Sequence, residues 1–172
     1  MKMIDLLRHT ASDGDRLTAE GVAAAVDIGR GLAVRYDVAV SSGAQRATQT
    51  VGCLLAGLGQ PVPGGVVVVA ALLSAVEDRW RAAYRTAGAG DLSSLRAADP
   101  ELVTADSAVL ADGLHQIFAM LPVGGHALAV GHSPTNEAAV FGLTGVTIEP
   151  LGKGAAVTLT EHGGDYSVDA AD

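Results

Sequence analysis

The segment Met3-Ile4-Asp5-Leu6-Leu7-Arg8-His9-Thr10 sets a short apolar run directly before an arginine and a histidine. A short run rich in isoleucine and leucine is typical of a β-strand buried inside a sheet. Asp5 is the exception, because a carboxylate in a buried strand needs a partner or a place at the strand entrance. We therefore predict a strand over 3–7 whose carboxyl end carries Arg8 and His9.

The same order, a short apolar run and then an amphipathic segment, recurs along the 172 residues. Strands alternating with helices imply a mostly parallel sheet covered by helices on both faces, a three-layer α/β/α sandwich. No repeat or linker divides the chain, so we predict one α/β domain over 1–172. The predicted strands are 3–7, 37–41, 66–70 and 126–130, the predicted helices are 19–34, 45–58, 74–86, 106–121 and 134–143 with a short helix inside 87–100, and a hairpin or edge strand is expected at 155–169.

The composition narrows the class of protein. The net charge of −8 argues against nucleic-acid binding, which requires a basic face. The longest apolar run, 66–76, is about half as long as a membrane-spanning helix, and no signal-peptide core is present, so we expect no membrane association. The only cysteine, Cys53, permits no disulfide within the chain, and we expect a cytoplasmic protein. Clustered metal ligands are missing, so we expect neither a metal nor an organic cofactor.

Two further predicted strands end in residues that suit an anion site. The segment 41–46, Ser-Ser-Gly-Ala-Gln-Arg, places Arg46 just after the second strand, and 130–134, Val-Gly-His-Ser-Pro, places His132 after the fourth. The carboxyl ends of parallel strands meet at one edge of a sheet, and ligands bind outside that edge. We therefore expect both side chains to converge with the arginine and histidine of the first strand.

Two histidines among arginines suit phosphoryl transfer. A neutral imidazole can attack phosphorus to form a phosphohistidine, which divides one difficult displacement into two. Arginine forks bind phosphoryl oxygens bidentately and stay charged at any working pH. On these grounds we predict phosphoryl transfer through His9. The hydroxyl of Ser12 either contacts the phosphate or caps a turn, and no catalytic role is expected for His115, His126 or His162.

These motifs resemble those of a known family. Leu7-Arg8-His9-Thr10 is similar to the Arg-His-Gly signature of the histidine phosphatase superfamily, in its phosphoglycerate-mutase-like branch 1. Residues 41–50, Ser-Ser-x-x-x-Arg-Ala-x-Gln-Thr, resemble the second block of that family, and 130–134 resemble the third. Residues 17–21, Leu-Thr-x-x-Gly, resemble the usual start of its first helix. The four blocks follow the family's order along nearly the whole chain.

The resemblance implies a role for each of these residues. His9 would be the nucleophile that becomes phosphorylated. Arg8 and Arg46 would bind the phosphate, together with His132, which would also take part in catalysis. The reaction would need no metal ion.

The family also uses an acid between its second and third blocks as proton donor to the leaving group. The resemblance makes Glu77 our candidate, because it lies just after the third predicted strand. Asp78 is the neighbouring alternative, and the third possibility is that no acid of this segment serves. Trp80 and Tyr84 are four residues apart on the same predicted helix, so they either pack in the core or wall the leaving-group pocket.

Two departures from the family pattern bear on the activity. Thr10 stands where the family has glycine, which is compatible only with an ordinary backbone angle. The segment 11–16 is shorter than the corresponding loop of the mutases. The compact chain is more similar to the small bacterial phosphohistidine and sugar-phosphate phosphatases.

The prediction is a metal-independent phosphatase acting on a phosphorylated small molecule or a phosphohistidine protein. Two alternatives stay open: a catalytically weak module that binds phosphate or a phosphopeptide, and a phosphomutase. A serine hydrolase is disfavoured because the Gly-x-Ser-x-Gly elbow does not occur. The sequence indicates neither the physiological substrate nor the oligomeric state.

Overall fold

Four parallel strands and an antiparallel hairpin form one six-stranded sheet in the computed structural model, which describes residues 1–170. The strands are β1 (Lys2–Arg8), β4 (Val38–Ser41), β5 (Val66–Val68), β6 (His126–Gly131), β7 (Ala156–His162) and β8 (Asp165–Ala170). Their order across the sheet is β5-β4-β6-β1-β7-β8. Only β7 and β8 break the parallel arrangement. The predicted mostly parallel sheet with added C-terminal strands is confirmed.

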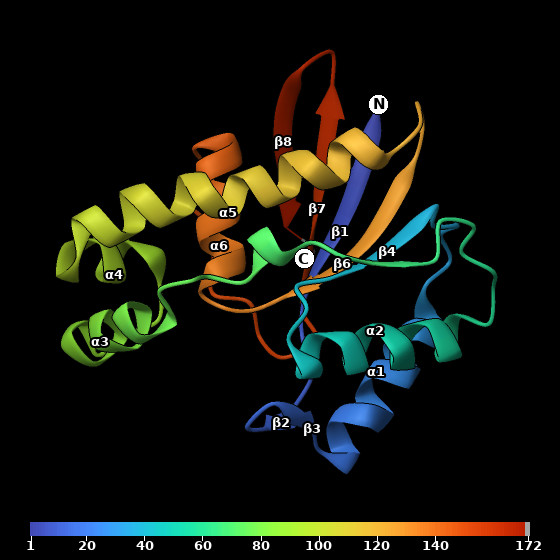
Figure 1. The fold of residues 1–172 in the computed structure, drawn as a ribbon, viewed down its shortest axis with the longest axis horizontal. Helices are drawn as coiled ribbons and strands as arrows, with labels where there is room; N and C mark the ends of the chain where they lie inside the picture. The colour runs from blue at the N-terminus through green and yellow to red at the C-terminus, as the bar shows by residue number, and fades with distance from the viewer. Residues whose placement is uncertain (171–172) are drawn as a thin grey trace.

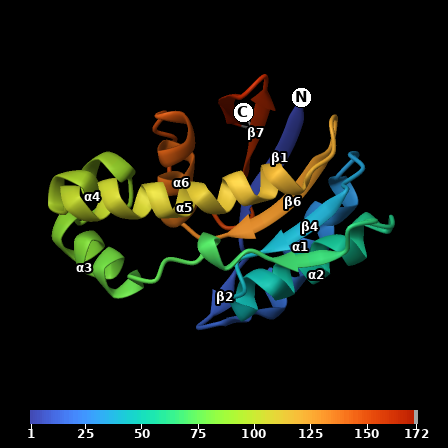
Figure 2. The ribbon, with the colours of Figure 1, turned by 45° about the horizontal axis from the view of Figure 1, so that its top comes forward.

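Helices cover both faces of this sheet, as the three-layer prediction requires (Figure 1). One layer holds α1 and α2, and the other holds α5 and α6, while α3 and α4 lie beyond one end of the sheet in both views (Figures 1 and 2). The helices are α1 (Ala19–Gly31), α2 (Gln45–Leu58), α3 (Glu77–Ala87), α4 (Leu92–Ala98), α5 (Pro100–Met120) and α6 (Thr135–Thr144). No helix within the described residues is both long and apolar enough to span a bilayer.

Alternate residues of the central strands face the two helical layers, because successive side chains of a strand point to opposite sides. Ile4 and Leu6 of β1 are fully buried in the larger apolar cluster, which includes Leu114 of α5. Leu7, the next residue along, is buried in the second cluster with Val51 of α2. The sheet is therefore held from both sides, and its edge is a rigid support for side chains placed there.

The register of the parallel strands brings the three motif ends together. Arg8 at the end of β1 is paired with Gly131 at the end of β6, and Ser41 at the end of β4 is paired with Val130. The ladder continues for one more bond on each side, from His9 N–H to the Gly131 carbonyl at 3.1 Å and from the residue after Ser41 to the Val130 carbonyl at 3.2 Å. The convergence predicted for these strand ends is present in the fold.

Several predicted boundaries were wrong. Helix α5 begins at Pro100 and not at 106, because Asp99 accepts a hydrogen bond from Leu102 N–H at 3.1 Å and proline suits the first helical position. The strand predicted over 66–70 ends at Val68, and Ala70–Leu72 forms a 3₁₀ turn. The helix predicted from 74 begins at Glu77, and the first helix ends at Gly31 and not at 34.

A small hairpin that was not predicted follows β1. It pairs β2 (Ser12–Asp13) with β3 (Arg16–Leu17) around Gly14, whose φ is +57°. An Asp-Gly step is a strong hairpin signal, because glycine adopts the left-handed angle without strain. The short segment after the first strand is therefore a folded element, and it carries Asp15 at its tip.

Asp5 is paired within the sheet. Its carboxylate accepts hydrogen bonds from the Tyr36 hydroxyl and the Thr158 hydroxyl, each at 2.7 Å, and Nε2 of His126 lies 3.1 Å away. Burial alone would raise the pKa of Asp5, but the bonds from His126, Tyr36 and Thr158 lower it overall. The charge inside the strand is thus compensated by three neighbours that come from distant parts of the chain.

Candidate active site

His9 lies just beyond β1, with a side chain that is only 5% exposed. Its Nδ1 lies 2.8 Å from the carbonyl oxygen of Thr10. A carbonyl oxygen can only accept, so Nδ1 carries the ring proton and Nε2 keeps a free lone pair. The ring of His132 is close by, with 5.3 Å between the two ring centroids. The fold therefore brings the two predicted histidines together and leaves Nε2 of His9 unprotonated.

His132 is fixed at the end of β6 by contacts on both sides. Its Nε2 lies 2.7 Å from the Ser42 hydroxyl, and its backbone N–H donates to the side chain of Asn136 at 3.1 Å. Asn136 in turn donates to the carbonyl of Leu7 at 3.0 Å, which ties α6 to β1. Nδ1 of His132 is buried and has no hydrogen-bond partner among residues 1–170. That nitrogen therefore needs a hydrogen-bond partner that the described residues do not supply.

Both imidazoles are neutral at ordinary pH. Burial lowers the pKa of His9 to about 4, the hydrogen bond to Thr10 opposes this, and three neighbouring cations add to it. Burial also lowers the pKa of His132 to about 3, and the charge of Arg46 contributes next. A histidine that attacks phosphorus must be unprotonated, so this environment suits a nucleophile.

Arg46 lies in the first turn of α2 and projects from there to the site. Its guanidinium bonds Asp15 at 2.8 Å and approaches Glu77 at 3.7 Å, and its side chain stays 21% exposed. Asp15 also accepts hydrogen bonds from the backbone N–H groups of Gln45 and Arg46, each at 3.2 Å. The hairpin thus caps α2 and orients the arginine in one step, and Asp15 is a contributor that the sequence motifs did not identify.

Arg8 is anchored on the other side of His9. One of its terminal nitrogens donates to the carbonyl of Leu151 at 2.8 Å, and Leu151 N–H donates to Glu137 at 2.7 Å. The Ser133 hydroxyl donates to the same oxygen of Glu137 at 2.6 Å, and no side-chain hydrogen bond caps the start of α6. Burial raises the pKa of Glu137, although the two hydrogen bonds oppose the shift.

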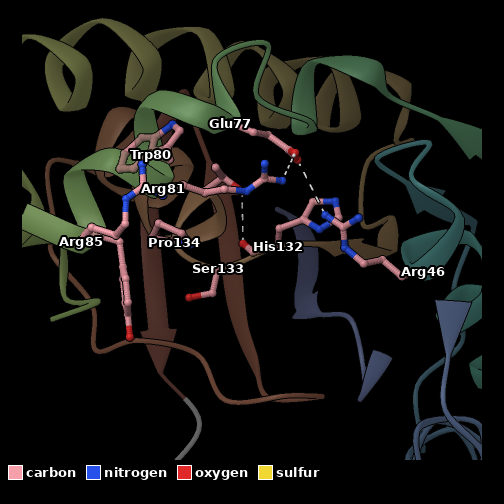
Figure 3. A pocket seen from close by; sticks show the side chains of 10 residues that line it. Arg46, Glu77, Trp80, Arg81, Arg85, His132, Ser133 and Pro134 are labelled. Atoms are coloured by element: carbon pink, nitrogen blue, oxygen red, sulfur yellow. Dashed lines mark hydrogen bonds and ion pairs between the residues drawn. The ribbon is translucent and has the colours of Figure 1, made fainter. Parts of the chain in front are cut away.

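A cleft of about 380 Å³ opens beside His132. Glu77 reaches it from the start of α3 and lies between Arg46 and Arg81, which it approaches at 3.7 Å and 3.3 Å (Figure 3). Trp80 is buried and Tyr84 is half exposed, and both line the cleft. Trp80 and Tyr84 were expected either to pack in the core or to wall the pocket, and Trp80 does both. Its indole N–H donates to Asp106 at 2.6 Å in the core.

Asp78 lies away from this cleft. Its side chain is 96% exposed and pairs with Arg81 at 2.8 Å. Ser12 is held in the hairpin opposite Leu17, and its hydroxyl makes no hydrogen bond within the described part of the chain. No hydrogen bond joins the Ser12 side chain to the two histidines or to Arg46 there, so its binding role stays a prediction.

Thr10 fits where the family pattern has glycine. No residue other than glycine has a positive φ within the described residues, so threonine is unstrained at this position. Its hydroxyl donates to the carbonyl of Gly21 at 2.8 Å, and its N–H donates to Thr50 at 3.3 Å. The side chain therefore braces α1 and α2 behind His9, and it does not point to the anion site.

Lys153 is a second site residue, besides Asp15, that the sequence motifs missed. Its ammonium nitrogen lies 3.5 Å from Nε2 of His9. Nothing in the segment around Lys153 marked it, because it precedes an antiparallel strand and follows none of the parallel ones. Residues 1–170 contain no group of three or more His, Cys, Asp or Glu side chains placed to hold a metal ion.

We compared the sequence and the structure with those of known proteins. No protein-family model matches the sequence, and no curated protein matches it. Solved structures do match. Phosphoglycerate mutase from Bacillus anthracis has a TM-score of 0.72 and 20% identity, covering 98% of this chain and 92% of that chain. Phosphoserine phosphatase from Entamoeba histolytica, in complex with 3-phosphoglyceric acid, has a TM-score of 0.68 and 15% identity, covering 99% and 96%.

A third match is the protein histidine phosphatase SixA in a complex with tungstate, with a TM-score of 0.59 and 20% identity, covering 97% of this chain and 94% of that chain. The three matched proteins and this chain therefore align over nearly their full lengths. The shared architecture agrees with the strand order and helical layers described above. The chain has the phosphoglycerate-mutase-like fold of the histidine phosphatases.

Proposed function

We propose that this protein is a metal-independent phosphatase that forms a phosphohistidine on His9. One observation carries the proposal: Nδ1 of His9 is committed to a carbonyl at 2.8 Å, so Nε2 keeps its lone pair beside a second histidine and near the charges of Lys153, Arg46 and Arg8. The resemblance of the motifs and the likeness of the fold support the same chemistry. Electrostatic stabilisation by arginines that are already in place would supply most of the rate enhancement.

The first step transfers the phosphoryl group to the enzyme. Nε2 of His9 attacks phosphorus, the N–P bond forms, and the bond from phosphorus to the leaving-group oxygen breaks. Arg8 and Arg46 bind the equatorial oxygens, and Nδ1–H of His132 donates to one of them. Glu77, in its protonated form, gives its proton to the departing oxygen, so that the leaving group departs as an alcohol.

The second step returns the enzyme to its starting state. A water molecule attacks the phosphorus of the phosphohistidine, Glu77 takes a proton from that water, and the N–P bond breaks. Inorganic phosphate is released and His9 is again neutral. Glu77 is placed for both steps because it lines the same cleft as His132.

The cleft favours a small phosphomonoester as the substrate. Its volume of about 380 Å³ lies within the usual range of small-molecule sites, roughly 300–1,000 Å³. Trp80 and Tyr84 offer apolar walls to the leaving group, and Arg81 lines the same space. A phosphohistidine protein is the competing substrate, and it would approach from the open side of the cleft. A cytoplasmic location stays a prediction that rests on the single cysteine.

The test compares the wild type with His9→Ala and with His162→Ala, which removes an exposed histidine far from the site. Hydrolysis of p-nitrophenyl phosphate should persist in EDTA, disappear in His9→Ala and be unchanged in His162→Ala. Rapid quenching in alkaline detergent should trap an alkali-stable, acid-labile phosphoryl group on the wild type and on His162→Ala, and none on His9→Ala. Tight phosphate binding without turnover of any phosphorylated substrate would identify a binding module instead. Dependence on a phosphorylated primer, with exchange between isomers, would identify a mutase.

A further inference from the structure

Lys153 is placed by the sheet and does not depend on a free loop. The antiparallel pairing of β7 with β1 continues beyond the strand, because Arg8 N–H donates to the Ala155 carbonyl at 3.0 Å and Gly154 N–H donates to the Arg8 carbonyl at 3.1 Å. A turn closed by Ala155 N–H and the Gly152 carbonyl at 3.0 Å then reverses the chain. Lys153 therefore lies beside the end of β1, at the level of His9.

Gly154 keeps this segment close to the site. Its φ is +76°, and a Cβ added there would lie 2.8 Å from Cδ1 of Ile28 and 3.4 Å from Cγ2 of Thr10. A side chain at this position would be strained by the backbone angle, and Cδ1 of Ile28 on α1 would have to shift. The glycine thus lets the backbone pass directly behind Thr10, so that the neighbouring lysine is within reach of the imidazole.

The side chain of Lys153 is directed at the reacting atom. Its Nζ lies 3.5 Å from Nε2 of His9, the nitrogen that has no proton and whose lone pair would attack phosphorus. An ammonium group has three donors and no acceptor, so it can face this lone pair only as a donor. A phosphoryl group bonded to Nε2 would occupy the same space and would meet the ammonium with its oxygens.

We infer that Lys153 is a catalytic residue of this site, whose ammonium binds the oxygens of the phosphoryl group as it moves to and from Nε2 of His9. The inference rests on the proposed function. Lys153 forms no covalent bond and gives up no proton in either step; it exchanges its contact with the lone pair for contacts with phosphoryl oxygens. It is a cation in addition to the arginines that the motifs identify.

The contact between Lys153 and His9 can be measured through the pKa of His9, because that pKa depends on the charges around the ring. Arg8 comes from its own strand, Arg46 from α2 and Lys153 from the turn before β7, while the neutral ring of His132 faces it from the end of β6. After burial, Lys153 contributes the largest charge effect among those that lower the pKa of His9. Asp15 from the hairpin faces Arg46 and acts in the opposite sense on His132.

The chain contains only two lysines, which provides an internal control. Lys2 donates to the carbonyl of Phe118 at 2.7 Å and belongs to the opposite end of β1. Burial, followed by the charges of Arg8 and Arg46, lowers the pKa of Lys153, which makes its amine more reactive. Reductive methylation with and without orthovanadate should therefore show, by peptide mass spectrometry, protection of Lys153 and no protection of Lys2. Equal labelling of Lys153 in both samples would overturn the inference.

Kinetics of Lys153→Met and Lys153→Arg separate a catalytic role from a structural one. In Lys153→Met we expect kcat/KM for p-nitrophenyl phosphate to fall about 100- to 1,000-fold, the scale of losing one donor to a developing oxyanion. The acidic limb of the pH profile of kcat/KM should move to higher pH, because His9 loses a cationic neighbour. Lys153→Arg should recover part of the rate and keep the wild-type limb.

The outcomes distinguish this inference from the proposed function. An inactive wild type would contradict the proposed function itself. An active wild type that loses activity in His9→Ala, with Lys153→Met showing the wild-type kcat/KM and the wild-type acidic limb, would overturn the role of Lys153 alone. A merely structural lysine would lower the melting temperature of Lys153→Met without moving the limb, and that result would overturn the role as well.

Discussion

The Ser42 hydroxyl and Nε2 of His132, 2.7 Å apart, join the end of β4 to the end of β6 through their side chains. The oxygen of Ser42 also accepts from Ala44 N–H at 3.4 Å, so its own proton is free to go to His132. If the serine donates to Nε2, the ring proton of His132 must be on Nδ1. Nδ1–H is then the donor that the proposed mechanism requires.

We therefore predict that Ser42→Ala impairs catalysis, because the ring proton of His132 is then no longer held on Nδ1. The expected loss in kcat is about fivefold, since one neutral hydrogen bond is worth roughly 1 kcal/mol. Ser42→Thr keeps the hydroxyl and should recover most of the rate. The measurement is kcat on p-nitrophenyl phosphate, with circular dichroism to confirm folding. Wild-type kcat in a folded Ser42→Ala protein would show that the hydroxyl does not set the tautomer.

Glu77→Gln should impair turnover most for substrates with poor leaving groups. The amide keeps the size of the side chain but cannot donate a proton to the departing oxygen. Alkyl phosphates should therefore slow by at least about 100-fold, while p-nitrophenyl phosphate, whose leaving group needs little protonation, should change much less. The measurement is log kcat/KM plotted against leaving-group pKa. A steep slope in Asp78→Asn and a wild-type slope in Glu77→Gln would reverse the assignment.

The two site histidines should make the stability of the fold depend on pH. The pKa values of His9 and His132 are about 4 and about 3, below the ordinary 6.5. The unfolded chain binds both protons below about pH 6.5 and the folded chain does not, so the free energy of unfolding falls as the pH drops through this window. His9 alone should account for a loss on the order of 3 kcal/mol by about pH 4.

Urea unfolding at several pH values between about 4 and 7 checks this expectation. His9→Asn should flatten the dependence, and His162→Asn, which alters an exposed histidine, should leave it as in the wild type. An equal slope for the wild type and His9→Asn would mean that His9 is not held neutral by the fold.

Asp5→Asn should destabilise the fold and leave the chemistry intact. The carboxylate accepts from Tyr36 and Thr158, and an amide at this position would turn one acceptor oxygen into a donor facing donors. We expect a loss of about 2–4 kcal/mol, the range for breaking a buried charged network. Tyr36→Phe should cost about 1 kcal/mol, since it removes one hydrogen bond. Urea midpoints give the stability, and kcat/KM of the folded fraction should match the wild type in both variants.

The sequence predicted the site residues that follow a recognisable local pattern and missed those that only the tertiary structure brings to the site. The positions of Arg8 and His9 at a strand end followed from the apolar run before them and from the geometry of parallel sheets. Glu77 could be proposed only from its place in the chain, and the structure puts it at the cleft and Asp78 outside it. Asp15 and Lys153 left no local pattern, because their proximity to the site depends on a hairpin and on an antiparallel register.

The start of α5 illustrates the other limit. Asp99-Pro100 is a good helix start in physical terms, yet the polar and small residues before 106 resembled a loop. Tertiary packing makes the segment before 106 helical, because Leu102 and Val103 are buried in the larger apolar cluster. Local propensity is a weak prior wherever a short stretch can bury its few apolar residues against a core.

The antiparallel direction of β7 has a consequence for biosynthesis. A strand that runs against its neighbours presents its beginning, and not its end, at the carboxyl edge of the parallel strands, and in this protein that beginning carries Lys153. The segment follows every other site residue in the chain, so the ribosome makes it after them. When the chain has been made as far as His132, the site residues Arg8, His9, Arg46 and His132 exist but Lys153 does not. On the proposed role of Lys153, the site is complete only once β7 pairs with β1.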